Sequence, residues 1–371
     1  MNKKEIFDIM KKFSSARAPS GLEQARGELF KAELEKIINI RDIKVNTDSL
    51  SNYFIKFSGQ PQSSKKTIAI LAHMDEIGGT IRKIKKNGLL EFSKRGGYEG
   101  RWLVSRTISI LNKDGKWING VIGGRSPHTT PQKLRGEEKI EPHEMEIFIG
   151  AKDKEEAVNK FKVHIGAPFV FSGKFELLNT DFDDNIIAGY SMDNLVALTG
   201  LVILTKKVMN NLLDESGKLR NPFDLYIVAT TREEIGTEGS LYFARNNSID
   251  EIIALDIGLV ENFPGTVSSD IKLHEGPVIV WQELSGTGIF DYQLCKALVR
   301  VAEQNGLKYQ EGVLEYYGSD AGKAQKWLGI PSALVGIPTM FAHNVPEIST
   351  LNGILEAVEL VYQYLKAHTY E

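Results

Sequence analysis

Histidine and acidic residues stand near the ends of several apolar segments of this chain, and together they could bind metal ions. The residues are His73 and Asp75, Asp193, Glu233 and Glu234, Asp256, and His343. Two divalent cations that share one carboxylate can activate a water molecule and bind the oxygen atom of the group that the water attacks. Imidazole and carboxylate ligands without thiolates suit zinc, cobalt or manganese. The sequence therefore predicts a hydrolase with two metal ions.

The spacing of the residues in two of these motifs suggests what they do. His73 and Asp75 are two residues apart, so their side chains point the same way on an extended strand. Asp75 could therefore orient a metal-binding His73 by accepting its second N–H group. The adjacent side chains of Glu233 and Glu234 point in different directions, so one could bind a metal ion while the other acts as general base. Spacing alone does not decide which glutamate has which role.

Each motif also has an ordinary structural interpretation when it is considered alone. The H-x-D motif at 73–75 could be a surface loop, and the glutamate pair could be a solvated face. Asp256 could be a cap or turn residue, and His343 an ordinary loop residue. The metal-site hypothesis depends on their combination, because these residues follow strands of one predicted sheet and supply the number of ligands that two metal ions need.

Alternating strand and helix patterns predict the elements that position these residues. Apolar segments rich in β-branched residues, such as TIAILAH at 67–73, are typical of strands buried on both faces of a mostly parallel sheet. Similar segments begin at 224, 251, 277 and 331, and helical periodicity predicts helices over 1–13, 192–213, 292–304 and 351–366. The alternation predicts an α/β fold. Four candidate segments fall at the C-terminal ends of these strands, where open α/β sheets bind ligands.

A different pattern separates the first candidate ligand from the others. Between about residues 80 and 184 the chain has short alternating segments with turn signals, including two strand-like runs around the KDG sequence at 113–115. We expect a small β-rich domain over 80–184, inserted into an α/β domain that comprises 1–79 and 185–371.

Composition and charge set further limits. The formal net charge of −3 over 371 residues gives no general electrostatic reason to bind nucleic acid or an anionic membrane. No apolar stretch approaches the roughly 18–20 residues of a membrane span, and the N-terminal segment lacks the apolar run of a signal peptide. The single Cys295 cannot form an internal disulfide and stands in a segment with helical spacing, so we expect a buried thiol. The expected location is the cytoplasm.

The order of the sequence motifs resembles that of a known protein family, and the resemblance covers nearly the whole chain. The motifs are APSGLE (18–23), AHMDEIGG (72–79), SMDN (191–194), REEIGTEGS (232–240), ALDIG (254–258), GSDAG (318–322) and GIPTMFAHNVPE (336–347). In this order they resemble the M42 family of dinuclear metallo-aminopeptidases, which includes glutamyl and TET aminopeptidases. The resemblance implies a mixed, mostly parallel sheet flanked by helices. It also implies that the inserted domain is a β-barrel or PDZ-like unit that builds oligomers.

The resemblance further implies which residues bind which metal ion. Asp193 would bridge two ions. Zinc or cobalt is the first expectation for both ions, and manganese is the second. His73 and Asp256 would complete the ligands of one ion. Glu234 and His343 would complete the ligands of the other.

The activity implied by the resemblance is removal of N-terminal residues from short peptides. A metal-bound hydroxide would attack the scissile carbonyl group while Glu233 transfers the proton, and Asp75 would orient His73. The peptide bond between Asp193 and Asn194 would be cis. Because family members form homo-oligomers, often dodecamers whose active sites face an inner chamber, we also expect a homo-oligomer.

Two other functions stay open at this point. The same metal site could remove the acyl group from an N-acylated amino acid or peptide, and a free N-terminal amine would then not be required. The chain could also be a non-catalytic, metal-binding scaffold that assembles into oligomers. The presence of Glu233 argues against a scaffold, because a purely structural metal site does not need a base beside its ligands.

Three positions where family members often carry an arginine have other residues in this chain. Leu195 follows the bridging aspartate, Met340 precedes His343, and Thr237 and Glu238 stand in place of a Leu-Arg pair. An arginine supplies a fixed charge and paired hydrogen bonds. These differences should therefore alter substrate selectivity more than metal affinity.

Overall fold

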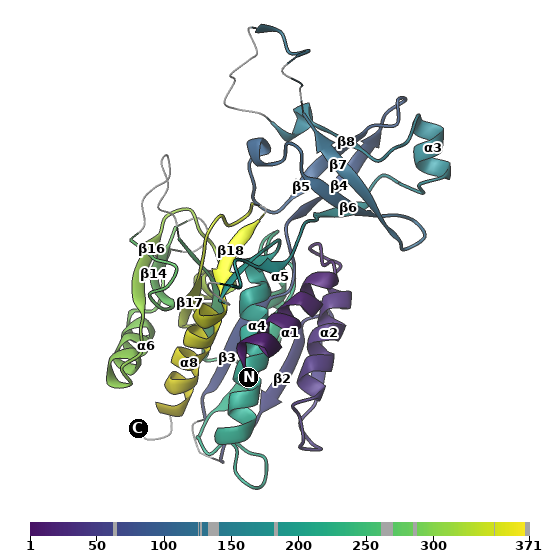
Figure 1. Cartoon of the computed structure of the whole chain (residues 1–371). Coiled ribbons are helices and arrows are strands. Elements are labelled where there is room, and N and C mark those ends of the chain that lie inside the picture. Colours follow the sequence, from purple (N-terminus) through teal and green to yellow (C-terminus); the bar gives the residue numbers. More distant parts are fainter. Residues whose placement is uncertain are drawn as a thin grey trace.

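The computed structural model of the chain contains a layered α/β part and a smaller β-barrel (Figure 1). It describes residues 1–371 apart from 62–64, 125, 127, 133–140, 182–184, 261–269, 285–287, 345 and 368–371. None of the helices in this described part combines the length and the apolar character that a membrane crossing needs.

A mixed sheet of nine strands forms the centre of the α/β part. Its strands are β1 (Val45–Thr47), β2 (Tyr53–Phe57), β3 (Thr67–His73), β12 (Asp224–Thr230), β13 (Glu251–Leu259), β14 (Val278–Glu283), β15 (Gly288–Ile289), β16 (Gln310–Leu314) and β17 (Ser332–Thr339). Their order is β1-β2-β12-β3-β13-β17-β14-β15, with β16 beside β14. The central strands β12, β3, β13 and β17 are parallel. Their C-terminal ends therefore lie along one edge of the sheet.

Helices cover this sheet and are packed against one another (Figure 1). They are α1 (Lys3–Ser15), α2 (Gln24–Glu35), α4 (Met192–Asn211), α5 (Glu238–Asn246), α6 (Tyr292–Gln304), α7 (Asp320–Leu328) and α8 (Leu351–Ala367). Helix α4 packs on β3 and β13, with α1, α2 and α8 against it. A capping box starts α1, because Asn2 accepts a hydrogen bond from the Glu5 N–H and the Glu5 side chain accepts one from Asn2.

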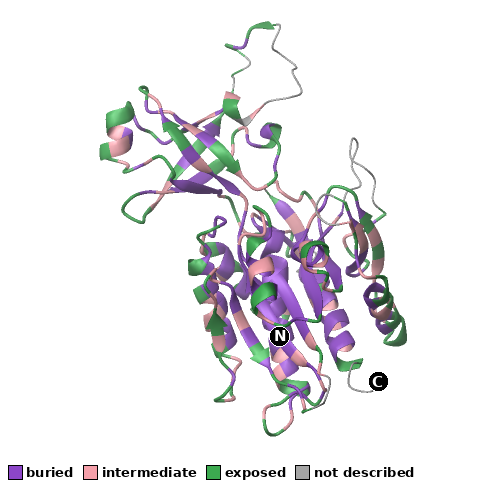
Figure 2. Cartoon of the chain, turned by 180° about the vertical axis from the view of Figure 1, so that it is seen from behind, coloured by how far each residue is buried: buried purple, intermediate pink, exposed green. Residues whose placement is uncertain are grey.

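The apolar runs of the sequence form the strands that were predicted from them. In β3 every residue from Ile68 to His73 is buried, which fits a strand with neighbours on both sides and cover on its faces. Figure 2 shows the same continuous burial across the central sheet. The helices predicted over 292–304 and 351–366 are confirmed as α6 and α8, and the thiol of Cys295 is buried, as expected.

The β-rich segment forms a closed barrel with an apolar core of its own. Its elements are β4 (Gly78–Ile84), β5 (Leu90–Arg95), η1 (Gly100–Trp102), β6 (Thr107–Leu111), β7 (Trp117–Gly123), η3 (Pro142–Glu144), β8 (Glu146–Phe148), α3 (Lys154–Asn159) and β9 (Pro168–Phe171). Inside it, the rings of Phe92 and Phe169 pack edge to face with centroids 5.4 Å apart. A barrel beside a helix-flanked mixed sheet confirms the predicted fold class. The domain boundaries stay a prediction.

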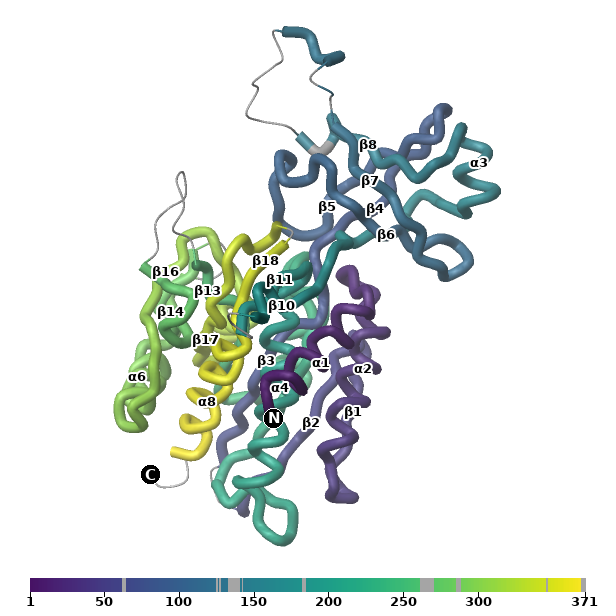
Figure 3. Tube along the Cα trace, in the orientation of Figure 1, coloured from purple at the N-terminus to yellow at the C-terminus, as the bar shows by residue number. Residues whose placement is uncertain are grey.

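A third, small sheet joins the barrel to the α/β part (Figure 3). It consists of β10 (Glu176–Leu177), β11 (Ile186–Gly189) and β18 (Glu347–Thr350), all antiparallel. Strand β11 leads into the start of α4, and β18 begins just after His343. Because Gly189 pairs with Glu347, the sheet brings two segments with candidate ligands together.

Candidate metal centre

The central strands carry three of the predicted metal ligands to the same edge of the sheet. His73 is the last residue of β3 and pairs in register with Thr230, the last residue of β12. Glu234 follows β12 after a short turn. Asp256 lies within β13, which continues to Leu259, so the expectation that this aspartate ends its strand is wrong. The strand continues because its parallel pairing with β17 extends to its last residue.

The other two predicted ligands stand on irregular backbone beside this edge. Asp193 lies at the start of α4, where its own backbone and that of Asn194 are not helical. The peptide bond between these two residues is cis, as expected. His343 follows β17 and has a positive φ of 58°. Both residues are thus presented by turns, whose shape the neighbouring strands determine.

The five predicted ligands come together in two groups that share one aspartate. One group contains His73, Asp193 and Asp256, and the other contains Asp193, Glu234 and His343. Within each group the candidate ligand atoms lie within 4.8 Å of one another. Asp193 Oδ1 is 2.9 Å from His73 Nε2, and Asp193 Oδ2 is 3.1 Å from His343 Nε2. Each oxygen of the shared carboxylate therefore faces a different group.

The donors in these groups fit a pair of divalent cations. Glu234 Oε1 is buried and has no hydrogen-bond partner within the described residues. A buried carboxylate oxygen without a partner is costly unless a cation compensates for it. The donors are imidazole nitrogens and carboxylate oxygens, three residues in each group, and they suit zinc or a similar ion. The assignment of the five residues as ligands is a proposal.

Neighbouring groups hold the two histidine rings so that Nε2 of each faces Asp193. His73 Nδ1 lies 3.4 Å from Asp75 Oδ1. His343 Nδ1 forms a hydrogen bond with the Gly97 carbonyl oxygen, which belongs to the loop after β5 of the barrel. Fixing Nδ1 in this way is the usual means by which a protein orients a metal-binding imidazole. The barrel therefore supplies part of the support for the site.

Asp75 also determines the path of the loop that carries both glutamates. Its Oδ1 accepts the Glu233 N–H at 2.9 Å, and its Oδ2 accepts the Glu234 N–H at 3.2 Å. The Ser20 hydroxyl donates to Oδ2 at 2.6 Å. Asp75 is fully buried and satisfied by these bonds, and its neighbours, His73 first among them, hold its pKa below the usual range although burial alone would raise it. This arrangement fits the supporting role expected for Asp75.

Two further carboxylates support the site and were assigned no role from the sequence. Glu347 accepts the His343 N–H at 2.8 Å and the Asp193 N–H at 3.3 Å. Glu23 accepts the Arg232 N–H at 3.1 Å and so anchors the start of the glutamate loop. The sequence feature that could have indicated Glu23 and Glu347 is their place in the motifs APSGLE and GIPTMFAHNVPE, which define the family resemblance. The spacing of the two residues does not show which backbone groups their side chains reach.

Burial shifts the pKa of the acidic groups around the centre. It raises the pKa of Glu233 and of Asp256 well above the ordinary value, and it raises the pKa of Glu234 to about 7. Burial alone would lower the pKa of His343, but the neighbouring Glu234 and Asp193 raise it well above its ordinary value. Glu233 has such a raised pKa and belongs to neither ligand group.

Comparison with known proteins agrees with this geometry. The family model described as M42 glutamyl aminopeptidase matches residues 51–360. This chain belongs to the M42 family. A relative from Acetivibrio thermocellus is 30% identical over 364 residues, which cover 98% of this chain and 99% of the relative. The family relationship supports aminopeptidase activity.

Solved structures of M42-like aminopeptidases have the same fold as this chain. An aminopeptidase from the archaeon Desulfurococcus kamchatkensis superposes with a TM-score of 0.84 at 27% identity, covering 98% of this chain and 94% of that chain. The TET1 peptidase of Pyrococcus horikoshii superposes with a TM-score of 0.81 at 26% identity, covering 96% of this chain and 98% of that chain. That peptidase can assemble into a tetrahedron or a large octahedral shell.

The three positions where this M42 chain differs from the common arginines do not line the cavity beside the centre. Leu195 is 1% exposed and belongs to the apolar core, and Met340 packs against that core. Glu238 forms an ion pair with Arg232 at 2.8 Å on the surface. An effect of these residues on selectivity would therefore be indirect.

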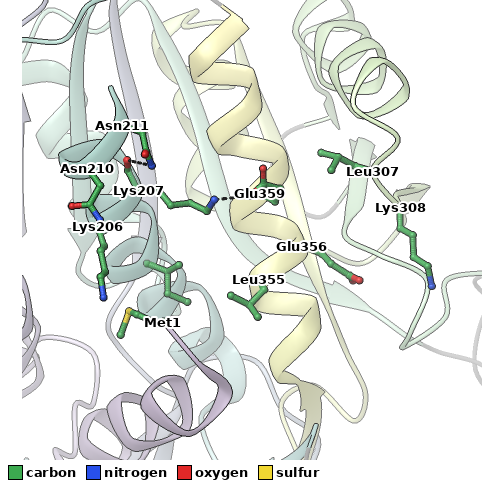
Figure 4. Close-up of a pocket in the computed structure, with 11 residues that line it drawn as sticks. Met1, Lys206, Lys207, Asn210, Asn211, Leu307, Lys308, Leu355, Glu356 and Glu359 are labelled. Carbon is green, nitrogen blue, oxygen red and sulfur yellow. Dashed lines mark hydrogen bonds and ion pairs between the residues drawn. The ribbon is translucent and has the colours of Figure 1, made fainter. Parts of the chain in front are cut away.

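Two cavities lie in different parts of the α/β region. A cavity of about 230 Å³ adjoins the candidate ligands and is lined by His73, Asp193, Glu233, Asp256 and His343 among others. A larger cavity of about 500 Å³ lies between α4 and α8, where Lys207 pairs with Glu359 at 2.7 Å (Figure 4). The larger cavity contains none of the candidate ligands, whereas the smaller one adjoins them.

Proposed function

We propose that this protein is an aminopeptidase that uses two divalent metal ions to remove N-terminal residues from short peptides. Zinc and cobalt are the leading candidates for these ions. The observation that carries the proposal is the sharing of Asp193 by two ligand groups, with Glu233 beside them in the same cavity. Family membership supports the peptide as substrate. The N-acyl hydrolase and the scaffold are not favoured by any of these observations.

The roles of the residues follow from their positions. Two divalent cations held by the five ligands would lower the pKa of a water molecule and polarise the scissile carbonyl group. Glu233 would accept a proton from that water and deliver it to the nitrogen of the leaving amine. Its raised pKa suits this exchange, because a base that must also return the proton works best near the operating pH. Asp75 would keep Glu233 in place through the backbone hydrogen bond to its N–H.

A mixed peptide library would test the proposed reaction. Each peptide is supplied with a free N-terminus and with an N-acetylated one, and the products formed with zinc or cobalt are identified by mass spectrometry. We expect stepwise loss of residues from the free N-termini alone. Removal of the acetyl group would instead indicate an N-acyl hydrolase. No cleavage by the metal-loaded protein would indicate a scaffold.

Metal binding is expected to weaken as the pH falls from 8 to 6. A cation can bind Glu234 only as a carboxylate and His343 only as a neutral ring, and the pKa of both is raised, that of Glu234 to about 7. Protons must then be displaced at lower pH, which weakens binding by about ten-fold per pH unit for each proton released. Calorimetric titration of zinc in two buffers of different ionisation enthalpy measures the number of protons.

The matched variant for this measurement is Glu234→Gln, which removes one of the titrating groups. It should release about one proton fewer per protein than the wild type at pH 6. An affinity for zinc that is the same at pH 6 and pH 8 would contradict the assignment of these two residues as ligands.

We further propose that the protein assembles into a homo-oligomer, with the dodecamer as the leading form. The assemblies of the similar TET1 peptidase support this. The barrel also exposes large apolar side chains on its surface, namely Trp102, Val121 and Phe148, and apolar groups of this kind are common where subunits meet. The cytoplasmic location stays a prediction.

A further inference from the structure

The lining of the cavity beside the candidate metal centre contains two chemically different sets of residues. One set comprises candidate ligands and Glu233. The other set, termed the apolar side, consists of Ile257, Leu259, Tyr316, Tyr317, Gly318 and Ala342. The Tyr317 hydroxyl donates to the Ile257 carbonyl oxygen at 3.1 Å, so the polar end of this side chain is already satisfied and its ring is held in place. The lining other than the candidate ligands and Glu233 is therefore mainly apolar and aromatic.

The size of the cavity suits one amino-acid side chain next to the reacting group. Its volume of about 230 Å³ is below the roughly 300–1,000 Å³ of pockets that enclose whole drug-sized ligands. Strand β13 supplies Ile257 and Leu259 directly after Asp256, and Tyr317 stands close before α7. The central sheet and the segment before α7 therefore both contribute to the lining of the cavity.

The described part of the cavity lining offers no lysine or arginine to a substrate side chain. The three stretches of sequence that contribute the apolar side, 251–271, 309–322 and 327–365, contain no lysine or arginine at all. Apart from His343, the charged residues in these stretches are glutamates and aspartates. An acidic side chain bound here would lose water without gaining an ion-pair partner.

The side chains of Arg106 and Arg232 are engaged elsewhere. Arg106 donates through Nε to the Trp102 carbonyl oxygen at 2.7 Å and through Nη2 to Asn344. Arg232 forms its ion pair with Glu238. Neither arginine is among the residues that line the cavity. A basic side chain of a substrate also lacks a dedicated partner, because every acidic group in the lining has a proposed metal-binding or proton-transfer role.

We propose that this site selects peptides whose N-terminal side chain is uncharged and apolar or aromatic, and that it rejects acidic N-terminal residues. The inference rests on the proposed function and names its substrate class. It sets this chain apart from the glutamyl specificity in the description of its family, since a site selective for glutamate requires a cation for the substrate carboxylate. The expected order is apolar or aromatic first, basic second and acidic last, because an acidic side chain would lose its hydration here without gaining an ion-pair partner.

The first experiment compares kcat/KM of the metal-loaded protein for tripeptides X-Ala-Ala with X as Leu, Phe, Gln, Lys or Glu. Gln and Glu have nearly the same shape, so their ratio reports charge alone. We expect Leu and Phe to exceed Glu by at least about 10²-fold and Gln to exceed Glu as well. Equal or better cleavage of the Glu peptide would overturn this inference and leave the aminopeptidase intact. Cleavage of none of the peptides would overturn the proposed function and this inference with it.

The second experiment introduces the missing charge. Leu259→Arg places a cation on the apolar side of the cavity, without replacing a proposed ligand or Glu233, and should raise the ratio of Glu to Leu cleavage by at least about ten-fold. Trp327→Arg adds the same charge at an exposed position of α7 outside the cavity. This control should keep the wild-type ratio. A ratio that changes equally in both variants would show that net charge, and not the cavity, controls selectivity. The wild-type series still decides the inference if Leu259→Arg does not fold.

Discussion

Replacement of Glu233 by glutamine is expected to lower kcat by about 10²–10⁴-fold while the protein keeps its metal content. Glutamine has nearly the same shape as glutamate but cannot accept a proton from water and return it to the leaving amine. Glu233 lines the cavity beside the ligands, yet neither ligand group includes it. The loss should therefore fall on turnover. The measurements are kcat for a free tripeptide and metal content by elemental analysis.

The matched control is Glu238→Gln, which makes the same chemical change nearby in the sequence, at the first residue of α5. The Glu238 side chain is 48% exposed and pairs with Arg232 at the surface, where an ion pair contributes little. This variant should keep near-wild-type kcat. Turnover near the wild-type level in E233Q would contradict the proposed proton transfer. Loss of metal ions from E233Q would indicate that Glu233 is itself a ligand.

The local patterns of the sequence were sufficient to predict the elements that position the site. A strand buried on both faces must be continuously apolar, and TIAILAH at 67–73 has this property, so β3 and its terminal His73 could be located without the structure. The same holds for the apolar runs that form β12, β13 and β17. The alternation of these runs with helical periods predicted the α/β fold and the position of the candidate ligands near one edge of the sheet.

The contacts that hold the site together depend on residues far apart in the sequence and could not be predicted in this way. Glu347 reaches the backbone N–H of Asp193, and His343 reaches the carbonyl oxygen of Gly97 in the barrel loop. Each contact joins segments more than a hundred residues apart, and it requires the relative placement of separate elements. The position of Asp256 inside β13 was missed for a similar reason, because the end of a strand depends on its pairing partner.

Removal of the shared carboxylate should affect both metal ions at once. In Asp193→Ala we expect loss of essentially all bound metal and of all turnover. Asp193 Oδ1 lies 2.9 Å from His73 Nε2, and Asp193 Oδ2 lies 3.1 Å from His343 Nε2, so one side chain belongs to both ligand groups. Each group is left with two donors, fewer than the three or four protein ligands of ordinary zinc sites.

Asp256→Ala provides the comparison that tests how the ligands are connected. Asp256 belongs to one group only, so its loss should lower the metal content by about one ion per subunit and leave the group of Asp193, Glu234 and His343 complete.

A general loss of structure is controlled by Asp291→Ala, because Asp291 also stands at a helix start, where it caps α6 and belongs to neither ligand group. That variant should cost about 0.5–2 kcal/mol of stability but keep both ions. If Asp193→Ala retained one ion, the two groups could not depend on a common carboxylate, and the second ion would need a ligand outside these five residues.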